Sequence, residues 1–155
     1  HINHNTNKGS VLWYTKAQKR QMYFVNGLAI PNGMAYVPPM IWYANKNSLT
    51  VFALANARRP TEKTPLYCAP FFNIYEDGKV CMGSVNINIK NSASVEEFTN
   101  GWEDYFFNSY FSHLFGRNSP IKGNCVNLWK DLINSDKSFP KEVLKKNNKT
   151  LKNLL

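Results

Sequence analysis

The stretch from Pro70 to Gly83 constrains the fold more strongly than any other part of the chain. Apolar and aromatic residues lead into Asp77-Gly78, a dipeptide that suits a tight turn because both residues tolerate a positive φ. A short return segment then leads to Cys81. The pattern predicts a β-hairpin with a thiol just beyond its turn.

That position makes Cys81 a candidate nucleophile. A cysteine beside a turn can be partly exposed while a sheet fixes its backbone, and exposed thiolates are the reactive ones. Asn73 precedes Cys81 across the turn, where its side-chain amide could stabilise an oxyanion during acyl transfer. The alternative is that Cys81 is a small apolar strand residue and Asn73 a turn former, because unpaired cysteines are often buried.

The run from Asn73 to Cys81 closely resembles the active-site segment of ubiquitin-conjugating enzymes. In that family a His-Pro-Asn motif is followed by a turn containing glycine and then by Val/Ile-Cys-Leu. The resemblance implies that Cys81 carries a ubiquitin-like protein as a thioester and that Asn73 supports attack by an amine. The chain departs from the family at Phe71-Phe72, which stand in place of His-Pro.

Several other segments resemble the PRTRC system protein B family, a bacterial group related to ubiquitin-conjugating enzymes. The resemblance covers most of the chain from about Gly9 onward and implies a cassette with three partners. These are a ThiF-like adenylating enzyme, a ubiquitin-like protein and a JAB-type peptidase. The matching segments are Val11–Trp13, Val37-Pro38, Ile41-Trp42, Arg59–Tyr67, Ala69–Asn73, Trp102–Phe107, Phe111–His113 and Leu128-Trp129.

His113 is a third candidate for the site. Imidazole titrates near neutral pH, so His113 could act as a base toward Cys81 or accept a proton from an incoming amine. The alternative is a packed, hydrogen-bonded histidine among Phe111, Leu114 and Phe115. We therefore take Cys81, Asn73 and His113 as the candidate catalytic residues.

Composition limits the other functions of the chain. Its 155 residues, 43% hydrophobic and 14% aromatic, exclude disorder and suffice for one core. No apolar run reaches the roughly 20 residues that cross a bilayer, and no signal peptide is visible. Cys68, Cys81 and Cys125 contain no C-x-x-C pair. We expect a cytoplasmic protein without membrane contact, metal or cofactor.

Two alternative functions remain, one suggested by the net charge of +9 and the other by the departure at Phe71-Phe72. Nucleic acid is a candidate partner, because lysines dominate the chain after Asp136. Such a run is more often a solvated face or a loose tail. The other alternative is a non-catalytic adaptor that binds a ubiquitin-like protein without using Cys81.

The order of the expected elements predicts an α+β fold. We expect an antiparallel meander of about four or five strands with helices packed on one side, which is also the ubiquitin-conjugating fold. The domain would span residues 10–140, with a polar, mobile leader at 1–9 and a basic, at most weakly helical tail at 141–155. Strands are expected at 11–14, 21–25, 40–44, 49–54, 66–75 and 85–89.

The first two strands should pair as a hairpin, and the third and fourth as another. Ser92 or Ser94 should cap a helix from Val95 to about Phe107, and a second helix should cover 126–133. In the first helix, aromatic residues at helical spacing should form a core stripe, while Glu103 and Asp104 face solvent.

Overall fold

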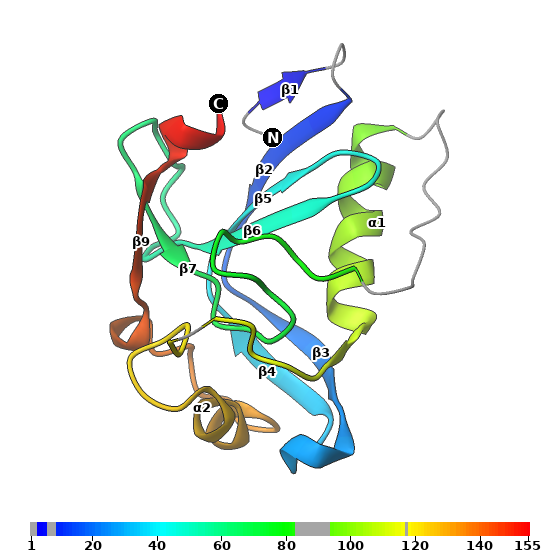
Figure 1. The fold of residues 1–155 in the computed structure, drawn as a ribbon, viewed down its shortest axis with the longest axis vertical. Helices are drawn as coiled ribbons and strands as arrows, with labels where there is room; N and C mark the ends of the chain where they lie inside the picture. Colours follow the sequence, from blue (N-terminus) through cyan, green and yellow to red (C-terminus); the bar gives the residue numbers. More distant parts are fainter. Residues whose placement is uncertain (1–2, 6–8, 83–93, 117) are drawn as a thin grey trace.

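A computed structural model of the chain describes residues 3–5, 9–82, 94–116 and 118–155 (Figure 1). Among these residues the α+β class is confirmed, with a six-stranded sheet in the order β1-β2-β5-β6-β7-β9 and a three-stranded sheet in the order β4-β3-β8. The strands are β1 (Asn3–Asn5), β2 (Ser10–Thr15), β3 (Gln18–Phe24), β4 (Gly33–Val37), β5 (Met40–Ala44), β6 (Leu49–Ala53), β7 (Pro65–Cys68), β8 (Tyr110–Phe111) and β9 (Lys146–Thr150).

The helices are α1 (Val95–Asn108) and α2 (Cys125–Leu132), accompanied by the 3₁₀ helices η1 (Asn26–Leu28), η2 (Lys141–Val143) and η3 (Leu151–Leu154). No helix in the described ranges is long and apolar enough to cross a bilayer. The expected strand at 85–89 and the alternative cap Ser92 lie outside the described residues.

The expected hairpin between β2 and β3 is wrong. The two strands are successive parts of one bent strand, and they pair antiparallel with β5 and β4 respectively. Thr15 pairs with Met40 and Gln18 pairs with Val37, so the register is the same on both sides of the bend. Pro38-Pro39 lie at the bend and have no N–H to donate, which interrupts the ladder and lets one ribbon enter two sheets.

The second predicted hairpin is confirmed. Strands β5 and β6 pair antiparallel, with Met40 opposite Ala53 at one end and Ala44 opposite Leu49 at the other. Asn45 fixes the turn between them, since its Oδ1 accepts hydrogen bonds from the backbone N–H groups of Asn47 (2.7 Å) and Ser48 (2.9 Å). Asparagine favours such turns because its side chain mimics a backbone carbonyl.

Helix α1 begins and ends close to the predicted residues. The Ser94 hydroxyl accepts a hydrogen bond of 3.1 Å from the Glu97 N–H, and Glu96 and Glu97 lie at the positive end of the helix dipole. Its aromatic stripe is buried against the sheet, with Trp102 and Phe106 almost inaccessible. In Figure 1, α1 and β9 lie on opposite sides of the central strands.

Glu103 does not face solvent as expected. It is half-buried, and the Trp13 indole Nε1–H donates a 3.1 Å hydrogen bond to its Oε2. Burial raises the pKa of Glu103, and the bond from Trp13 partly opposes that rise. Asp104 is exposed, as predicted, and it pairs with Arg20 across 3.4 Å.

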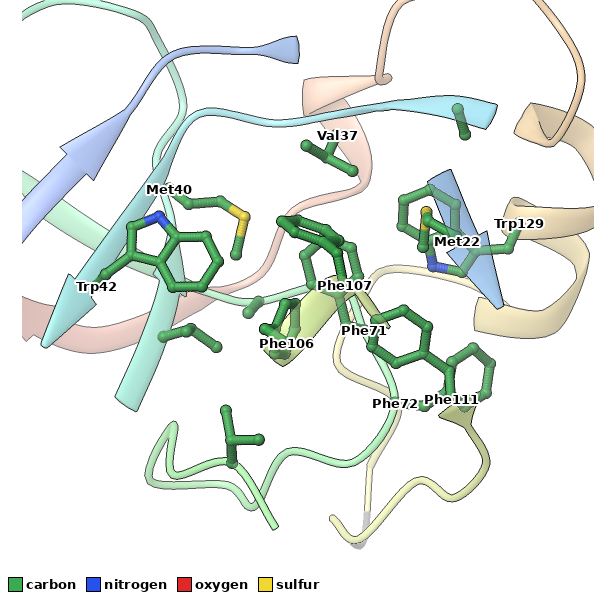
Figure 2. Packing of buried hydrophobic residues seen from close by; sticks show 14 of the residues in the cluster. Met22, Val37, Met40, Trp42, Phe71, Phe72, Phe106, Phe107, Phe111 and Trp129 are labelled. Carbon is green, nitrogen blue, oxygen red and sulfur yellow. The ribbon is translucent and has the colours of Figure 1, made fainter. Parts of the chain in front are cut away.

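The main sheet has a packed cluster on each face, because successive side chains of a strand point to opposite faces. Trp13, Trp42 and Val51 lie in the larger cluster with the two helices. Their neighbours Leu12, Ile41 and Phe52 lie in a smaller cluster that includes Leu151 of η3. Figure 2 shows the aromatic part of the larger cluster.

The C-terminal segment is not the weakly helical tail that its sequence suggests. Strand β9 pairs antiparallel with β7, through Tyr67 with Lys146 and Pro65 with Thr150. Leu144 and Leu151 flank this strand and are buried, so apolar anchors hold it at both ends. Asn148 takes a φ of +65°, a conformation that asparagine tolerates within an otherwise extended segment.

Candidate functional site

The predicted turn before Cys81 is present. The Gly78 N–H donates to the Tyr75 carbonyl (2.9 Å), the Tyr75 N–H donates to the Lys79 carbonyl (2.8 Å), and Ile74 pairs with Val80. Gly78 has a φ of +91°, which explains the glycine at this position. The expected strand at 66–75 is shorter than predicted, because β7 ends at Cys68 and the chain is irregular before Ile74.

The return segment of this hairpin is fixed to the main sheet. The Val51 N–H donates to the Gly78 carbonyl and the Val80 N–H donates to the Leu49 carbonyl, both at 2.9 Å. The same edge of strand β6 therefore pairs with two segments. Phe52 and Ala53 pair with β7, and Thr50 pairs with Lys79 of the hairpin. The Cys81 N–H donates a 2.7 Å hydrogen bond to the Asn73 carbonyl, and the Cys81 side chain is half-buried. The rigid backbone thus presents a partly accessible thiol.

Asn73 connects the hairpin to the segment that follows α1. Its backbone has a φ of +67°. The Asn73 side-chain Nδ2 donates to the Tyr110 carbonyl (2.9 Å), and its Oδ1 accepts from the N–H (3.1 Å) and the hydroxyl (2.9 Å) of Ser112. One of the two Nδ2 protons is thus engaged in positioning this segment.

His113 is exposed rather than packed in the core, because the chain leaves the core after Phe111. Its Nδ1 lies 2.9 Å from the Ser112 hydroxyl, which gives its own proton to Asn73. In the tautomer in which Nδ1 donates to that hydroxyl, Nε2 is the acceptor nitrogen of the ring. The ring stacks on Phe115 with centroids 6.0 Å apart. The His113 N–H and carbonyl also contact Asn73, so the histidine belongs to the same network as the hairpin.

Phe71-Phe72, the departure from the ubiquitin-conjugating motif, lie in the core. Both side chains are 1% exposed. The Phe71 ring packs against Phe106 and Trp129 with centroids 5.3 Å from each, and against Phe111 at 5.8 Å (Figure 2). The adjacent Pro70 carbonyl accepts a 2.7 Å hydrogen bond from the Trp129 indole. The position of the family's histidine is therefore used for packing.

Two tyrosines beside Cys81 were missed by the sequence analysis. The Tyr105 hydroxyl, on α1, donates to the Met82 carbonyl at 3.3 Å. The pKa of Tyr105 is raised mainly by burial and to a smaller extent by the charge of Cys81. A hydrogen bond with Cys81 first, and then its charge, raise the pKa of Tyr75. Tyr75 could have been found from the sequence, because residues two apart in a strand, such as Asn73 and Tyr75, point to the same face. No pattern in the sequence near Tyr105 indicates that this residue approaches the site.

The other two cysteines have different surroundings. Cys125 is buried with its Sγ 3.8 Å from the Pro70 carbonyl, and burial raises the pKa of its thiol to about 12. Cys68 is half-buried, and its Sγ accepts a hydrogen bond of 3.4 Å from Asn147 Nδ2. Within the described ranges, no group of three or more His, Cys, Asp or Glu residues could hold a metal ion.

A cavity of about 320 Å³ lies next to the hairpin. Its wall includes Cys68, Tyr75, Phe115 and Lys146, so it joins the hairpin to β9 and to the segment after β8. Cys81 does not line it. The cavity thus borders the hairpin without including the candidate nucleophile in its wall.

The fold is that of a ubiquitin-conjugating-enzyme-like domain, with a cysteine beyond the hairpin turn. The chain belongs to prokaryotic E2 family D, whose family model matches residues 2–147. No curated protein and no solved structure matches the chain significantly. Membership of this family connects the chain to the conjugation of ubiquitin-like proteins.

Proposed function

We propose that Cys81 carries a ubiquitin-like protein as a thioester and passes it to an amine. In the first step the Cys81 thiolate attacks the activated acyl carbon, and the bond from that carbon to its carrier group breaks as the C–S bond forms. In the second step an amine attacks the thioester carbon. The tetrahedral oxyanion then collapses, the C–S bond breaks, the thiolate leaves, and the nitrogen loses a proton to a base.

The placement of Cys81 is the observation that carries this proposal. Its backbone is held by the 2.7 Å bond to Asn73, its thiol is partly accessible, and the chain belongs to an E2-like family. Asn73 holds the segment that contains His113, whose Nε2 is a candidate base for the incoming amine. Cys125 is a poor competitor, because a thiol with a pKa near 12 is almost fully protonated at neutral pH.

The proposed partners are those implied by the resemblance to the PRTRC system protein B family. A ThiF-like adenylating enzyme would activate the ubiquitin-like protein, and a JAB-type peptidase would cleave its conjugates. The broad match to prokaryotic E2 family D is compatible with this assignment.

The test is intact-mass analysis under non-reducing conditions after mixing the chain with ATP, the ThiF-like enzyme and the ubiquitin-like protein. We expect an adduct that thiols cleave, present in the native chain and in Cys68→Ser but absent in Cys81→Ser. Cys68→Ser is the matched control, because it removes another half-buried thiol of the same domain. A native chain that stays unmodified while the adenylating enzyme becomes charged would exclude thioester formation.

A second candidate is an adaptor that binds the ubiquitin-like protein without chemistry. The burial of Phe71-Phe72 favours it, since neither of these side chains can form the hydrogen bonds expected of the histidine in the family's motif. Titration calorimetry with the ubiquitin-like protein distinguishes the two candidates. Binding without any adduct in the preceding experiment would support the adaptor.

A further inference from the structure

The cavity beside the hairpin gathers exposed apolar side chains in one place. Tyr75, Leu114 and Phe115 are large hydrophobic residues that are exposed, and all three line this cavity. The rings of Tyr75 and Phe115 stack with centroids 4.8 Å apart and an angle of 24° between the ring planes. Ile74 and Phe71 add to the apolar part of the wall. Exposed apolar side chains that converge on a hollow are typical of a binding site.

The cavity wall also carries positive charge. Lys145 and Lys146 line the cavity, and neither forms an ion pair with another residue that the structure describes. Lys145 is half-buried, and its ammonium donates a 2.9 Å hydrogen bond to the Ser119 carbonyl. That bond holds the ammonium in place and uses one of its three N–H donors. A partly desolvated cation bound to a neutral group is stabilised by an anion that enters the cavity.

Charge and size narrow the choice of ligand. Glu76 is the single acidic residue among the described residues of the wall, so two lysines leave the wall with a net positive charge. The Glu76 side chain lies over Gly116, with its Cγ 3.1 Å from the position that a Cβ would take at that glycine. The volume of about 320 Å³ is near the lower end for ligand pockets, roughly 300–1,000 Å³. The cavity therefore suits a small ligand, or the last residue of a peptide, with one apolar part and one negative charge.

We propose that this cavity binds a carboxylate attached to an apolar group. The apolar group lies against the stacked rings of Tyr75 and Phe115. The carboxylate accepts a hydrogen bond from the Lys145 ammonium, and Lys146 adds a second positive charge. Free aromatic or aliphatic acids have this chemistry, and so does the C-terminus of a peptide that ends in an apolar residue. The proposal is independent of the reaction at Cys81, because Cys81 does not line the cavity.

The test is a titration of the native chain with four ligands, followed through the NMR signals of its backbone amides. Phenylbutyrate and an acetylated Ala-Ala-Phe peptide carry the carboxylate, whereas phenylbutanol and the C-terminal amide of the same peptide lack it. We expect a carboxylate to bind about tenfold more tightly than its neutral counterpart, because it gains a charge-assisted hydrogen bond. The tighter of the two carboxylates identifies the source, a free acid or a peptide end. Equal affinities within both pairs would overturn the proposal.

Two variants separate the charged part of the site from its apolar part. Lys145→Gln should weaken phenylbutyrate about tenfold and leave phenylbutanol unchanged, because only the carboxylate uses the ammonium. Phe115→Ala should weaken both ligands about fivefold, because both use the ring. Lys152→Gln is the matched control, since it removes an exposed lysine on η3 that is outside the wall. Equal losses of phenylbutyrate affinity in Lys145→Gln and Lys152→Gln would contradict the site, and the comparison of ligands on the native chain decides the proposal even if a variant is unstable.

Cysteine alkylation locates the bound ligand. Cys68 lines the cavity and is half-buried, whereas Cys81 is outside the wall. Saturating phenylbutyrate should therefore slow the modification of Cys68 by iodoacetamide several-fold and leave the rate at Cys81 unchanged, as measured by peptide mass spectrometry. If Cys68 reacts equally fast with and without phenylbutyrate, the ligand binds elsewhere and the proposal fails.

Discussion

At the scale of single residues, Phe71 separates this chain most clearly from the ubiquitin-conjugating motif. Its ring lies between Phe106, Phe111 and Trp129, and two residues later Asn73 begins the candidate site. An imidazole at position 71 would be surrounded by aromatic carbon. Restoring the family's histidine therefore conflicts with the core.

We predict that Phe71→His lowers the free energy of unfolding by about 3 kcal/mol, because it removes a buried ring and buries polar nitrogens. Urea denaturation measures the change. Phe115→His is the matched control, since Phe115 is 41% exposed and should lose less than about 1 kcal/mol. A Phe71→His variant as stable as the native chain would show that the core accommodates an imidazole.

At the scale of elements, the hairpin before Cys81 depends on a glycine for two reasons. Gly78 has a positive φ, and a Cβ at this position would lie 2.6 Å from Cζ of Phe52. Phe52 is buried in the cluster on the opposite face from the helices. The turn is thus packed directly against the sheet. Any side chain at position 78 has to displace the turn from its contact with Phe52.

Gly78→Ala should cost about 2 kcal/mol or more, from the strained backbone and the contact with Phe52. It should also slow thioester formation, because Cys81 follows the displaced turn. Gly27→Ala provides the comparison, since nothing lies within 4 Å of the added methyl group and its φ is not positive. Equal stabilities of the two variants, measured by urea unfolding, would contradict this account of the turn.

At the scale of the whole molecule, the C-terminal residues complete the main sheet. Strand β9 forms one of its edges, and Leu151 covers the cluster that contains Leu12, Phe52 and Leu66. Lys146 and Lys149 therefore lie on a structural strand, and Lys152 lies on η3 beside it. Edge strands commonly carry lysine, because its charge discourages pairing with other chains.

Deletion of residues 145–155 should abolish cooperative thermal unfolding and increase the binding of a hydrophobic dye, because it uncovers this cluster. The double variant Lys146→Gln, Lys152→Gln should unfold like the native chain, since both side chains are exposed. The same double variant is the proper test of nucleic-acid binding by these lysines. If the deleted chain still unfolds cooperatively at the native temperature, the segment does not support the fold.

The sequence predicted the features that depend on neighbouring residues. The turn at Gly78, the cap at Ser94 and the extent of α1 each follow from a local pattern, and the structure reproduces them. Features that depend on distant contacts were not accessible. Glu103 is half-buried because it binds Trp13, and β9 is held in the sheet by the burial of Leu151. The residues next to Glu103 and Leu151 in the sequence indicate neither contact.

The same limit applies to the candidate site. Cys81 and Asn73 were identified by their spacing, and the structure joins them by a backbone hydrogen bond. The hydroxyl network of Ser112 and the approach of Tyr105 depend on how α1 returns to the hairpin. Pairing of β2 with β5 likewise goes together with the bend at Pro38-Pro39, which depends on the partner strands and not on the local sequence.

The burial of Phe71 also restricts how such a chain could change over time. A core built around this ring and a core with a histidine at the same position are separate solutions, and the shortest mutational route between them passes through a less stable protein. Exchange between the two would need compensating changes in the surrounding rings, which are 0–1% exposed. Variants of this domain are therefore expected to explore the surface of the site more readily than the residue beneath it.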